Sequence, residues 1–257
     1  MAQTPTLVLV PGAWHSPDTW GKIVSAMEPR DFKCVPVALP TTSSSNAKFS
    51  DDVKAVRESV LAETTQGRDV VVVVHSYGGA VGSSAIKGLT LKGPHHSSST
   101  DKASGHVIGF FMIASGFMVG GVTFLDGLGG KPPPSWDADY ENNVAALKVD
   151  IRELFYHDLS EEEGDYWVGR IQSQSLKAFT EGAEDAYAGW MEVPVWYLAT
   201  TEDRALPIEA QRFFVQGAKD AGGDVTLREI ESSHSPMLSK PDETVKVLME
   251  GIESFVA

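Results

Sequence analysis

The sequence predicts an α/β fold, in which a mostly parallel sheet of about six strands is flanked by helices. The first observation is the run of five valines from Val70 to Val74, because a strand buried on both faces has no polar side. The second is the alternation of short apolar strands with amphipathic helices along most of the 257 residues. The third is a change of pattern over residues 116–191, which predicts a helical cap inserted into a core made of residues 1–115 and 192–257.

Each predicted strand is a short apolar run that ends at a turn or at the start of a helix. The proline in the second run places that strand at an edge or a strand end, since proline donates no ladder hydrogen bond. The expected strands are 6–10, 34–39, 70–74, 107–114, 193–199 and 225–230.

The predicted helices begin at capping residues and carry apolar residues on one face. Ser16 and Pro17 are a capping serine and a first-turn proline. Asp51 or Asp52 is expected to cap the helix that Gly67 ends. The other expected helices follow Ser76, begin at Pro207 and span 240–256, and those of the cap span 141–156, 161–172 and 184–191.

Composition and charge exclude several classes of function. The formal net charge is −14, and no block of lysine and arginine could follow a nucleic-acid backbone. The apolar runs are far shorter than the roughly 20 residues that cross a bilayer. The single cysteine, Cys34, excludes an internal disulfide and is interpreted as buried and inert, and His95 and His96 are interpreted as surface residues. We therefore expect a cytoplasmic monomer or homodimer without a metal or cofactor and without a nucleic-acid or membrane partner.

The candidate nucleophile is Ser76, in the stretch His-Ser-Tyr-Gly-Gly that follows the valine strand. A sharp turn from a strand into a helix exposes the central side chain and directs backbone N–H groups towards it. The alternative is an ordinary strand–turn–helix that contains a serine. Val74 departs from the G-x-S-x-G pattern because it occupies the position of the first glycine.

Three predicted strand ends carry a serine, an aspartate and a histidine in that order. Ser76 follows the third strand, Asp203 the fifth and His234 the last. A serine hydroxyl needs a histidine to accept its proton, and a carboxylate holds that histidine in one tautomer. Glu202 is the competing candidate for the acid.

An oxyanion hole is expected from two backbone N–H groups. One belongs to Tyr77, directly after the candidate nucleophile. The other lies after the first strand, where Gly12 permits close approach of the backbone, and Ala13 is favoured over Trp14.

Three stretches of the sequence carry recognisable motifs: Leu-Val-Leu-Val-Pro-Gly-Ala-Trp-His near the start, Val-His-Ser-Tyr-Gly-Gly, and Ser-His-Ser-Pro-Met-Leu-Ser-Lys-Pro near the end. Together they resemble the α/β-hydrolase superfamily, and more narrowly its plant methylesterase and hydroxynitrile lyase branch and related microbial hydrolases. The resemblance covers the whole chain. It implies Ser76 as nucleophile, His234 as base, Asp203 as the orienting acid, and Ala13 and Tyr77 as oxyanion donors.

The sequence departs from the lyases of that branch in ways that bear on the reaction. Those lyases carry a lysine directly after the catalytic histidine and a threonine in the oxyanion loop, whereas this chain has Ser235 and Gly12. Hydrolysis is therefore favoured over cyanohydrin cleavage. Pro11 replaces the histidine that usually precedes Gly-Ala, which bears on the pocket wall rather than on the N–H donors.

The aromatic content of the predicted cap indicates a hydrophobic pocket for a small, uncharged, largely apolar molecule. The sequence thus predicts a cofactor-free serine hydrolase that cleaves a small apolar carboxylic ester or lactone through an acyl-enzyme, and it does not distinguish a methyl ester, an aryl ester and a lactone. A lyase or carbon–carbon bond-cleaving enzyme on the same scaffold and a non-catalytic small-molecule receptor are the alternatives. The residues expected to contact substrate are Trp14, His15, Phe117, Phe124, Trp136, Phe155, Phe179 and Met237.

Overall fold

The computed structural model describes residues 4–92 and 105–257, so His95 and His96 lie outside the described residues. Within the described residues, six strands form one parallel sheet in the order β2-β1-β3-β4-β7-β8. The predicted α/β fold is confirmed. The strands are β1 (Thr6–Val10), β2 (Cys34–Pro36), β3 (Val70–His75), β4 (Val107–Ile113), β7 (Val195–Thr200) and β8 (Val225–Ile230).

The valine strand β3 lies inside the sheet, between β1 and β4. All five of its valines are at most 1% exposed, as expected for a strand covered on both faces. Strand β2 forms one edge and ends at Pro36, which agrees with the position predicted for a proline-containing strand.

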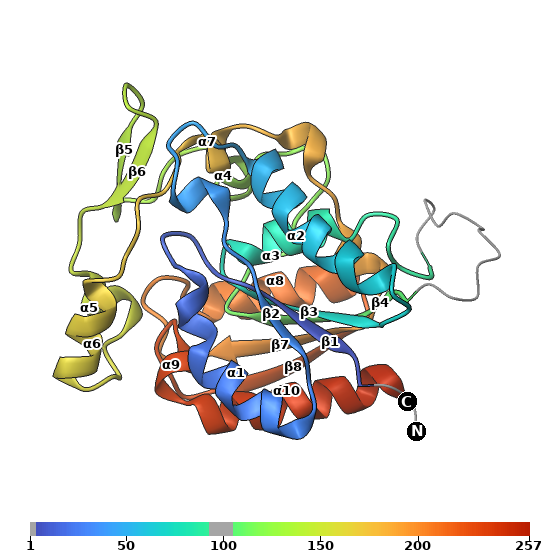
Figure 1. Cartoon of the computed structure of the whole chain (residues 1–257). Coiled ribbons are helices and arrows are strands. Elements are labelled where there is room, and N and C mark those ends of the chain that lie inside the picture. Colours follow the sequence, from blue (N-terminus) through green and yellow to red (C-terminus); the bar gives the residue numbers. More distant parts are fainter. Residues whose placement is uncertain (1–3, 93–104) are drawn as a thin grey trace.

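Helices cover both faces of the sheet (Figure 1). Helices α1 (Gly21–Met27) and α10 (Pro241–Val256) lie on one face, and α2 (Phe49–Thr64), α3 (Gly78–Ala85) and α8 (Ile208–Asp220) lie on the other. The shorter helices are α4 (Phe124–Gly127), α5 (Ile151–Phe155), α6 (Glu161–Val168), α7 (Lys177–Thr180) and α9 (Pro236–Ser239).

The capping predicted at Ser16 is present, whereas that predicted for α2 is not. Ser16 Oγ accepts the N–H of Asp18, at the start of a short 3₁₀ turn. Helix α2 begins three or four residues earlier than expected, with Lys48 instead of Asp51 or Asp52 in the capping position. Asp51 accepts the Lys48 N–H at 2.8 Å, and Asp52 is fully buried one residue further on. The carboxylate of Asp52 therefore does not cap α2.

The segment between β4 and β7, residues 114–194, is called the inserted segment below. It contains a β-hairpin where the sequence predicted a helix. Strands β5 (Trp136–Asp139) and β6 (Val144–Leu147) pair antiparallel. The predicted helix over 141–156 is wrong except for its last turn, α5. Asp139 Oδ1 accepts the N–H groups of Glu141 and Asn142, and this local turn competes with a helix.

The other two helices predicted for this segment are shorter than expected. Only Glu161–Val168 of the predicted 161–172 helix forms. The predicted helix over 184–191 is replaced by two 3₁₀ turns, Ala183–Asp185 and Gly189–Glu192. The hairpin and helices α5 and α6 lie on the side to which the arrowhead of β7 points (Figure 1). This part of the inserted segment therefore lies at the carboxyl end of the sheet.

Candidate active site

Ser76 lies on a sharp turn between β3 and α3 and has a φ of 51°. This left-handed conformation is uncommon for any residue other than glycine. Gly78 makes the turn possible, since a Cβ at this position would lie 2.5 Å from the carbonyl oxygen of Pro11. The elbow geometry that the sequence predicted is present.

The valine at the first elbow position is accommodated by a glycine on the facing helix. A Cβ at Gly82, in α3, would lie 2.7 Å from Val74 Cγ1. The small residue needed between strand and helix is therefore supplied by the helix instead of the strand. With valine at position 74, β3 and α3 approach closely at Gly82 instead, and the turn at Ser76 is unchanged.

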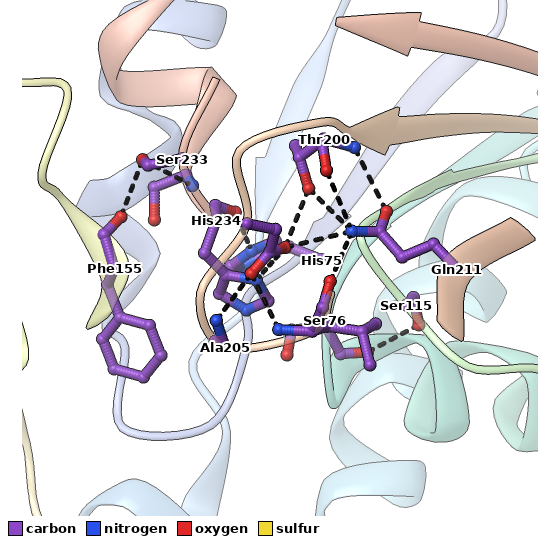
Figure 2. A network of polar contacts seen from close by, with 12 residues as sticks. His75, Ser76, Ser115, Phe155, Thr200, Ala205, Gln211, Ser233 and His234 are labelled. Atoms are coloured by element: carbon purple, nitrogen blue, oxygen red, sulfur yellow. Dashed lines mark hydrogen bonds and ion pairs between the residues drawn. The ribbon is translucent and has the colours of Figure 1, made fainter. Parts of the chain in front are cut away.

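Asp203 and His234 meet at the carboxyl ends of β7 and β8, where His234 Nδ1 lies 2.7 Å from Asp203 Oδ2 (Figure 2). The other carboxylate oxygen accepts the N–H groups of Ala205 and Leu206 at 2.8 and 2.7 Å. Burial by itself raises the pKa of Asp203, but the charge and hydrogen bond of His234 and the other donors hold this pKa below its ordinary value. The aspartate is therefore ionised at neutral pH.

The competing acid, Glu202, does not reach His234. Its side chain is exposed, and its backbone carbonyl accepts a hydrogen bond from His157 Nε2 at 2.9 Å. Of the two neighbouring carboxylates, the structure brings Asp203 and not Glu202 to the histidine.

Two further residues hold the carboxylate of Asp203 and were not predicted from the sequence. Thr200 Oγ1 donates to Asp203 Oδ2 at 2.8 Å, and Gln211 Nε2 lies 3.2 Å from the same oxygen (Figure 2). Gln211 is fully buried in α8. A polar residue on the inner face of an amphipathic helix was the signal that could have identified it.

The candidate oxyanion donors flank the serine. The backbone N–H groups of Ala13 and Tyr77 make no hydrogen bond within the described residues. The N–H of Trp14, in contrast, donates to Gln174 Oε1 at 3.1 Å. Ala13 therefore has a free donor and Trp14 does not, which agrees with the preference drawn from the sequence.

Two buried histidines, His15 and His75, support the candidate site without reaching its carboxylate. His15 Nδ1 lies 2.6 Å from the carbonyl oxygen of Ala13, and burial lowers the pKa of His15 to about 4. His75 Nε2 bonds the backbone carbonyl of His234 at 2.8 Å, and burial lowers the pKa of His75 well below its ordinary value. Both rings are neutral at neutral pH.

Four consecutive residues of the inserted segment, Phe155–Asp158, contact three of the loops that carry the site. Phe155 O accepts from Ser233 Oγ at 2.9 Å (Figure 2). Asp158 accepts the N–H of the same serine. Tyr156 Oη lies 2.7 Å from His15 Nε2. Together with the bond from His157 to Glu202, these contacts join the segment to the loops after β1, β7 and β8.

A cavity of about 210 Å³ opens between these loops and the inserted segment. Ser76 and His234 line it, and its other walls come from the ends of β1, β4 and β7 and from residues 116–136 and 154–155. No aspartate, glutamate, lysine or arginine is among the described residues that line it. The cavity therefore fits a small uncharged molecule.

Six of the eight predicted substrate contacts line this cavity, namely Trp14, His15, Phe117, Phe124, Trp136 and Phe155. Phe179 and Met237 do not. Phe179 is fully buried behind the wall, where its ring packs on Trp14, Phe124 and Trp136. Sequence analysis missed several apolar lining residues: Met118, Val119, Val122, Leu128, Leu154, Leu206 and Phe214.

The described residues contain no group of three or more histidine, cysteine, aspartate or glutamate side chains placed to hold a metal ion. Among the described helices, none has the length and apolar character needed to traverse a lipid bilayer. Cys34 is half-buried, and burial together with the charge of Glu28 raises the pKa of its thiol to about 11.

Comparison with known proteins agrees with the fold. A model of the alpha/beta hydrolase family matches residues 7–247. The chain is 28% identical over 248 residues to alpha/beta hydrolase nvfD of Aspergillus novofumigatus, covering 95% of each chain.

Solved structures share the fold at low identity. A pyrethroid hydrolase from Sphingobium faniae matches with a TM-score of 0.72 at 20% identity, over 97% of each chain. Polyneuridine aldehyde esterase matches with a TM-score of 0.71 at 21% identity, over 96% of this chain and 99% of the other. With the family match over nearly the whole chain, they confirm the resemblance seen in the sequence: this chain belongs to the alpha/beta hydrolase family.

Proposed function

We propose that the protein hydrolyses small uncharged carboxylic esters or lactones through an acyl-enzyme formed on Ser76. The observation that carries this proposal is that the strained serine and the aspartate-bound His234 line one uncharged apolar cavity. A hydrolase of this family needs a nucleophile, a base and a place for the scissile carbonyl, and this cavity offers all three.

In the first half of the reaction, Ser76 Oγ attacks the carbonyl carbon and its proton passes to His234 Nε2. Asp203 occupies Nδ1, so Nε2 is the nitrogen left to accept this proton. The carbonyl oxygen gains negative charge, which the N–H groups of Ala13 and Tyr77 stabilise. The C–O bond to the alcohol then breaks, and the alcohol departs with the proton from His234.

The second half of the reaction releases the acid. Water gives a proton to His234 Nε2 and attacks the acyl carbon, again forming an oxyanion between the two N–H groups. The bond to Ser76 Oγ then breaks and the serine recovers its proton from His234. For a lactone the acid and alcohol leave as one hydroxy acid.

The lining of the cavity supports an apolar substrate and favours hydrolysis over cyanohydrin cleavage. A charged group would lose its hydration there without gaining an ionic partner. Ser235 occupies the position of the lyase lysine and is 1% exposed, outside the cavity lining. The ester class is also supported by the names of two structural relatives, an esterase and a pyrethroid hydrolase.

The test is hydrolysis of p-nitrophenyl acetate and a panel of uncharged esters by the wild type and by Ser76→Ala. We expect the alanine variant to lose at least about 10⁴-fold in kcat and to resist labelling by a fluorophosphonate. Ser25→Ala, at an exposed serine of α1, is the matched control and should keep both properties. Hydrolysis retained by Ser76→Ala, or labelling of a different serine, would refute the assignment.

A further inference from the structure

Asp52 is a fully buried carboxylate outside the cavity lining, and the reaction proposed above does not use it. Its Oδ1 accepts the backbone N–H of Thr41 at 3.0 Å. Its Oδ2 accepts hydrogen bonds from Thr41 Oγ1 at 2.5 Å and from Tyr77 Oη at 2.8 Å. All these donors are neutral, so the carboxylate is buried without a cation bonded to it.

The hydrogen bonds continue from Thr41 to the other side of the oxyanion hole. Gln174 is fully buried, and its Nε2 donates to Thr41 Oγ1 at 2.9 Å. Its Oε1 accepts the N–H of Trp14, the residue after Ala13. One uninterrupted chain of side-chain hydrogen bonds therefore joins Tyr77 to the loop that carries Ala13.

When Asp52 is ionised, every hydrogen bond on the side chains of this chain runs towards its carboxylate. Gln174 donates to Thr41, and the hydroxyls of Thr41 and Tyr77 both donate to Asp52. An ionised carboxylate accepts all three bonds from Thr41 and Tyr77, whereas a protonated acid or an amide has to donate a bond itself and so reverses or loses at least one of them. Burial raises the pKa of Asp52 to about 6, opposed by the hydrogen bonds from Thr41 and Tyr77.

Burying an ionised carboxylate among neutral partners costs desolvation free energy, and an apolar side chain of similar volume would commonly be as stable or more stable in its place. The hydrogen-bond network joins five separate segments: the loop after β1, the turn after β2, helix α2, the elbow after β3 and the inserted segment. A fully satisfied polar network of this kind fixes the relative positions of its members.

We propose that Asp52, Thr41 and Gln174 are positioning residues that hold the N–H groups of Ala13 and Tyr77 at the separation an oxyanion requires. This inference rests on the proposed function, since it assigns the two N–H groups to an oxyanion. None of the three residues lines the cavity. They act through the backbone of Trp14 and the side chain of Tyr77.

The experiment compares Asp52→Asn and Tyr77→Phe with the wild type, using enzyme whose active sites are counted with a fluorophosphonate. Asp52→Asn preserves shape and reverses one hydrogen bond, and Tyr77→Phe removes one hydroxyl but keeps the backbone N–H. We expect kcat for p-nitrophenyl acetate to fall about tenfold in Asp52→Asn, less than the 100- to 1,000-fold loss of a whole oxyanion donor, with KM little changed. Glu58→Gln, an exposed carboxylate-to-amide change on the same helix, should have no effect.

An aliphatic trifluoromethyl ketone supplies a readout that a purely structural role would not move. Ser76 Oγ adds to its carbonyl carbon and the oxygen becomes an oxyanion, so its affinity should fall by the same factor as kcat across the variants. If Asp52→Asn does not fold, Tyr77→Phe carries the test. An unchanged kcat per active site in the folded variants, or a loss of kcat with unchanged ketone affinity, would overturn the inference. Failure of the proposed function is separately visible, since the wild type would then show no Ser76-dependent hydrolysis.

Discussion

At the scale of single residues, Ser76 shows how neighbouring groups hold a strained backbone. Its N–H donates to the carbonyl oxygen of Ile113 at 3.0 Å. Its own carbonyl accepts from Ser115 Oγ at 2.6 Å and from the N–H of Gly79 at 3.0 Å. A left-handed conformation at a non-glycine residue costs about 1–3 kcal/mol and persists where surrounding contacts determine it. Here those contacts come from the end of strand β4, from the loop directly after it and from helix α3.

His15 predicts a pH dependence of stability. Its pKa is about 4 in the folded protein and 6.5 in the unfolded chain, mainly because burial disfavours the charged ring. The unfolded state therefore binds more protons between these values, and stability falls as the pH falls from 6.5 to 4. The contribution of His15 alone is about 3 kcal/mol.

This expectation can be measured by urea unfolding of the wild type and of His15→Gln at pH 7 and pH 4.5. Glutamine offers a donor and an acceptor but does not titrate. The variant should lose less stability than the wild type over this interval, whatever its absolute stability at pH 7. The pKa of His75 is also lowered, but His75 is present in both proteins and so does not account for a difference between their losses of stability. Equal losses in the two proteins would contradict the assignment.

At the scale of elements, strand β3 and helix α3 approach closely because Gly82 faces Val74. The arrangement predicts that the two positions compensate each other. Gly82→Ala should destabilise by about 1–3 kcal/mol through overpacking, and Val74→Ala by about 2 kcal/mol through loss of buried methyl groups. The double variant should be within about 1 kcal/mol of the wild type, since the new methyl fills the space that valine leaves.

Chemical unfolding of the four proteins gives the coupling free energy between these two positions. Phe110 is a second neighbour of Gly82, 3.3 Å from the ideal Cβ position, and stays in place throughout. Additive losses in the double variant would show that strand and helix do not compensate at this contact.

The inserted segment behaves as part of the site's framework. Trp14 Nε1 donates to Ala145 O in β6 at 2.7 Å, and Trp14 O accepts the N–H of Gln172 at 2.8 Å. Combined with the contacts of residues 155–158, these bonds tie the segment to the loop that carries Ala13. Displacing this part of the segment would break buried hydrogen bonds at the oxyanion hole, so we expect substrate to reach the cavity past residues 116–135 instead.

At the scale of the whole molecule, the cavity combines residues from five strand ends with the inserted segment and contains no formal charge from acidic or basic side chains among its described lining. The net charge of −14 adds a repulsive field for anions at a distance. The molecule is therefore expected to reject anionic esters by both desolvation and repulsion.

This expectation is tested with ethyl butyrate and the monoethyl ester of succinic acid, which have similar size and differ by one carboxylate. The neutral ester should have a kcat/KM at least about 100-fold higher, because a carboxylate would be buried without a partner. Raising the salt concentration should narrow the difference only slightly, since salt screens the distant repulsion and not the desolvation. Comparable values for the two esters would show that the cavity does not select by charge.

The sequence by itself determined the fold, the family and the identity of the principal candidate groups. Buried strands, turn residues and helix starts follow local rules, so the six strands and the turn at Ser76 could be predicted. Asp203 and His234 could be placed together because carboxyl ends of parallel strands meet at one edge of a sheet. The expected cytoplasmic location and oligomeric state stay predictions.

Only the tertiary structure decided the groups that depend on contacts between distant segments. Asp203 and Glu202 are neighbours in the sequence, and only the folded chain shows which of the two side chains meets His234 after β8. The hairpin at 136–147 forms where long-range pairing and a local turn prevail over helical propensity. Asp52 appeared to be a helix cap, and its burial against Thr41 and Tyr77 is visible only once three segments have come together. The local sequence pattern indicates which face of an element is apolar. The partner of a buried polar group, in contrast, is decided by how segments distant in the sequence pack together.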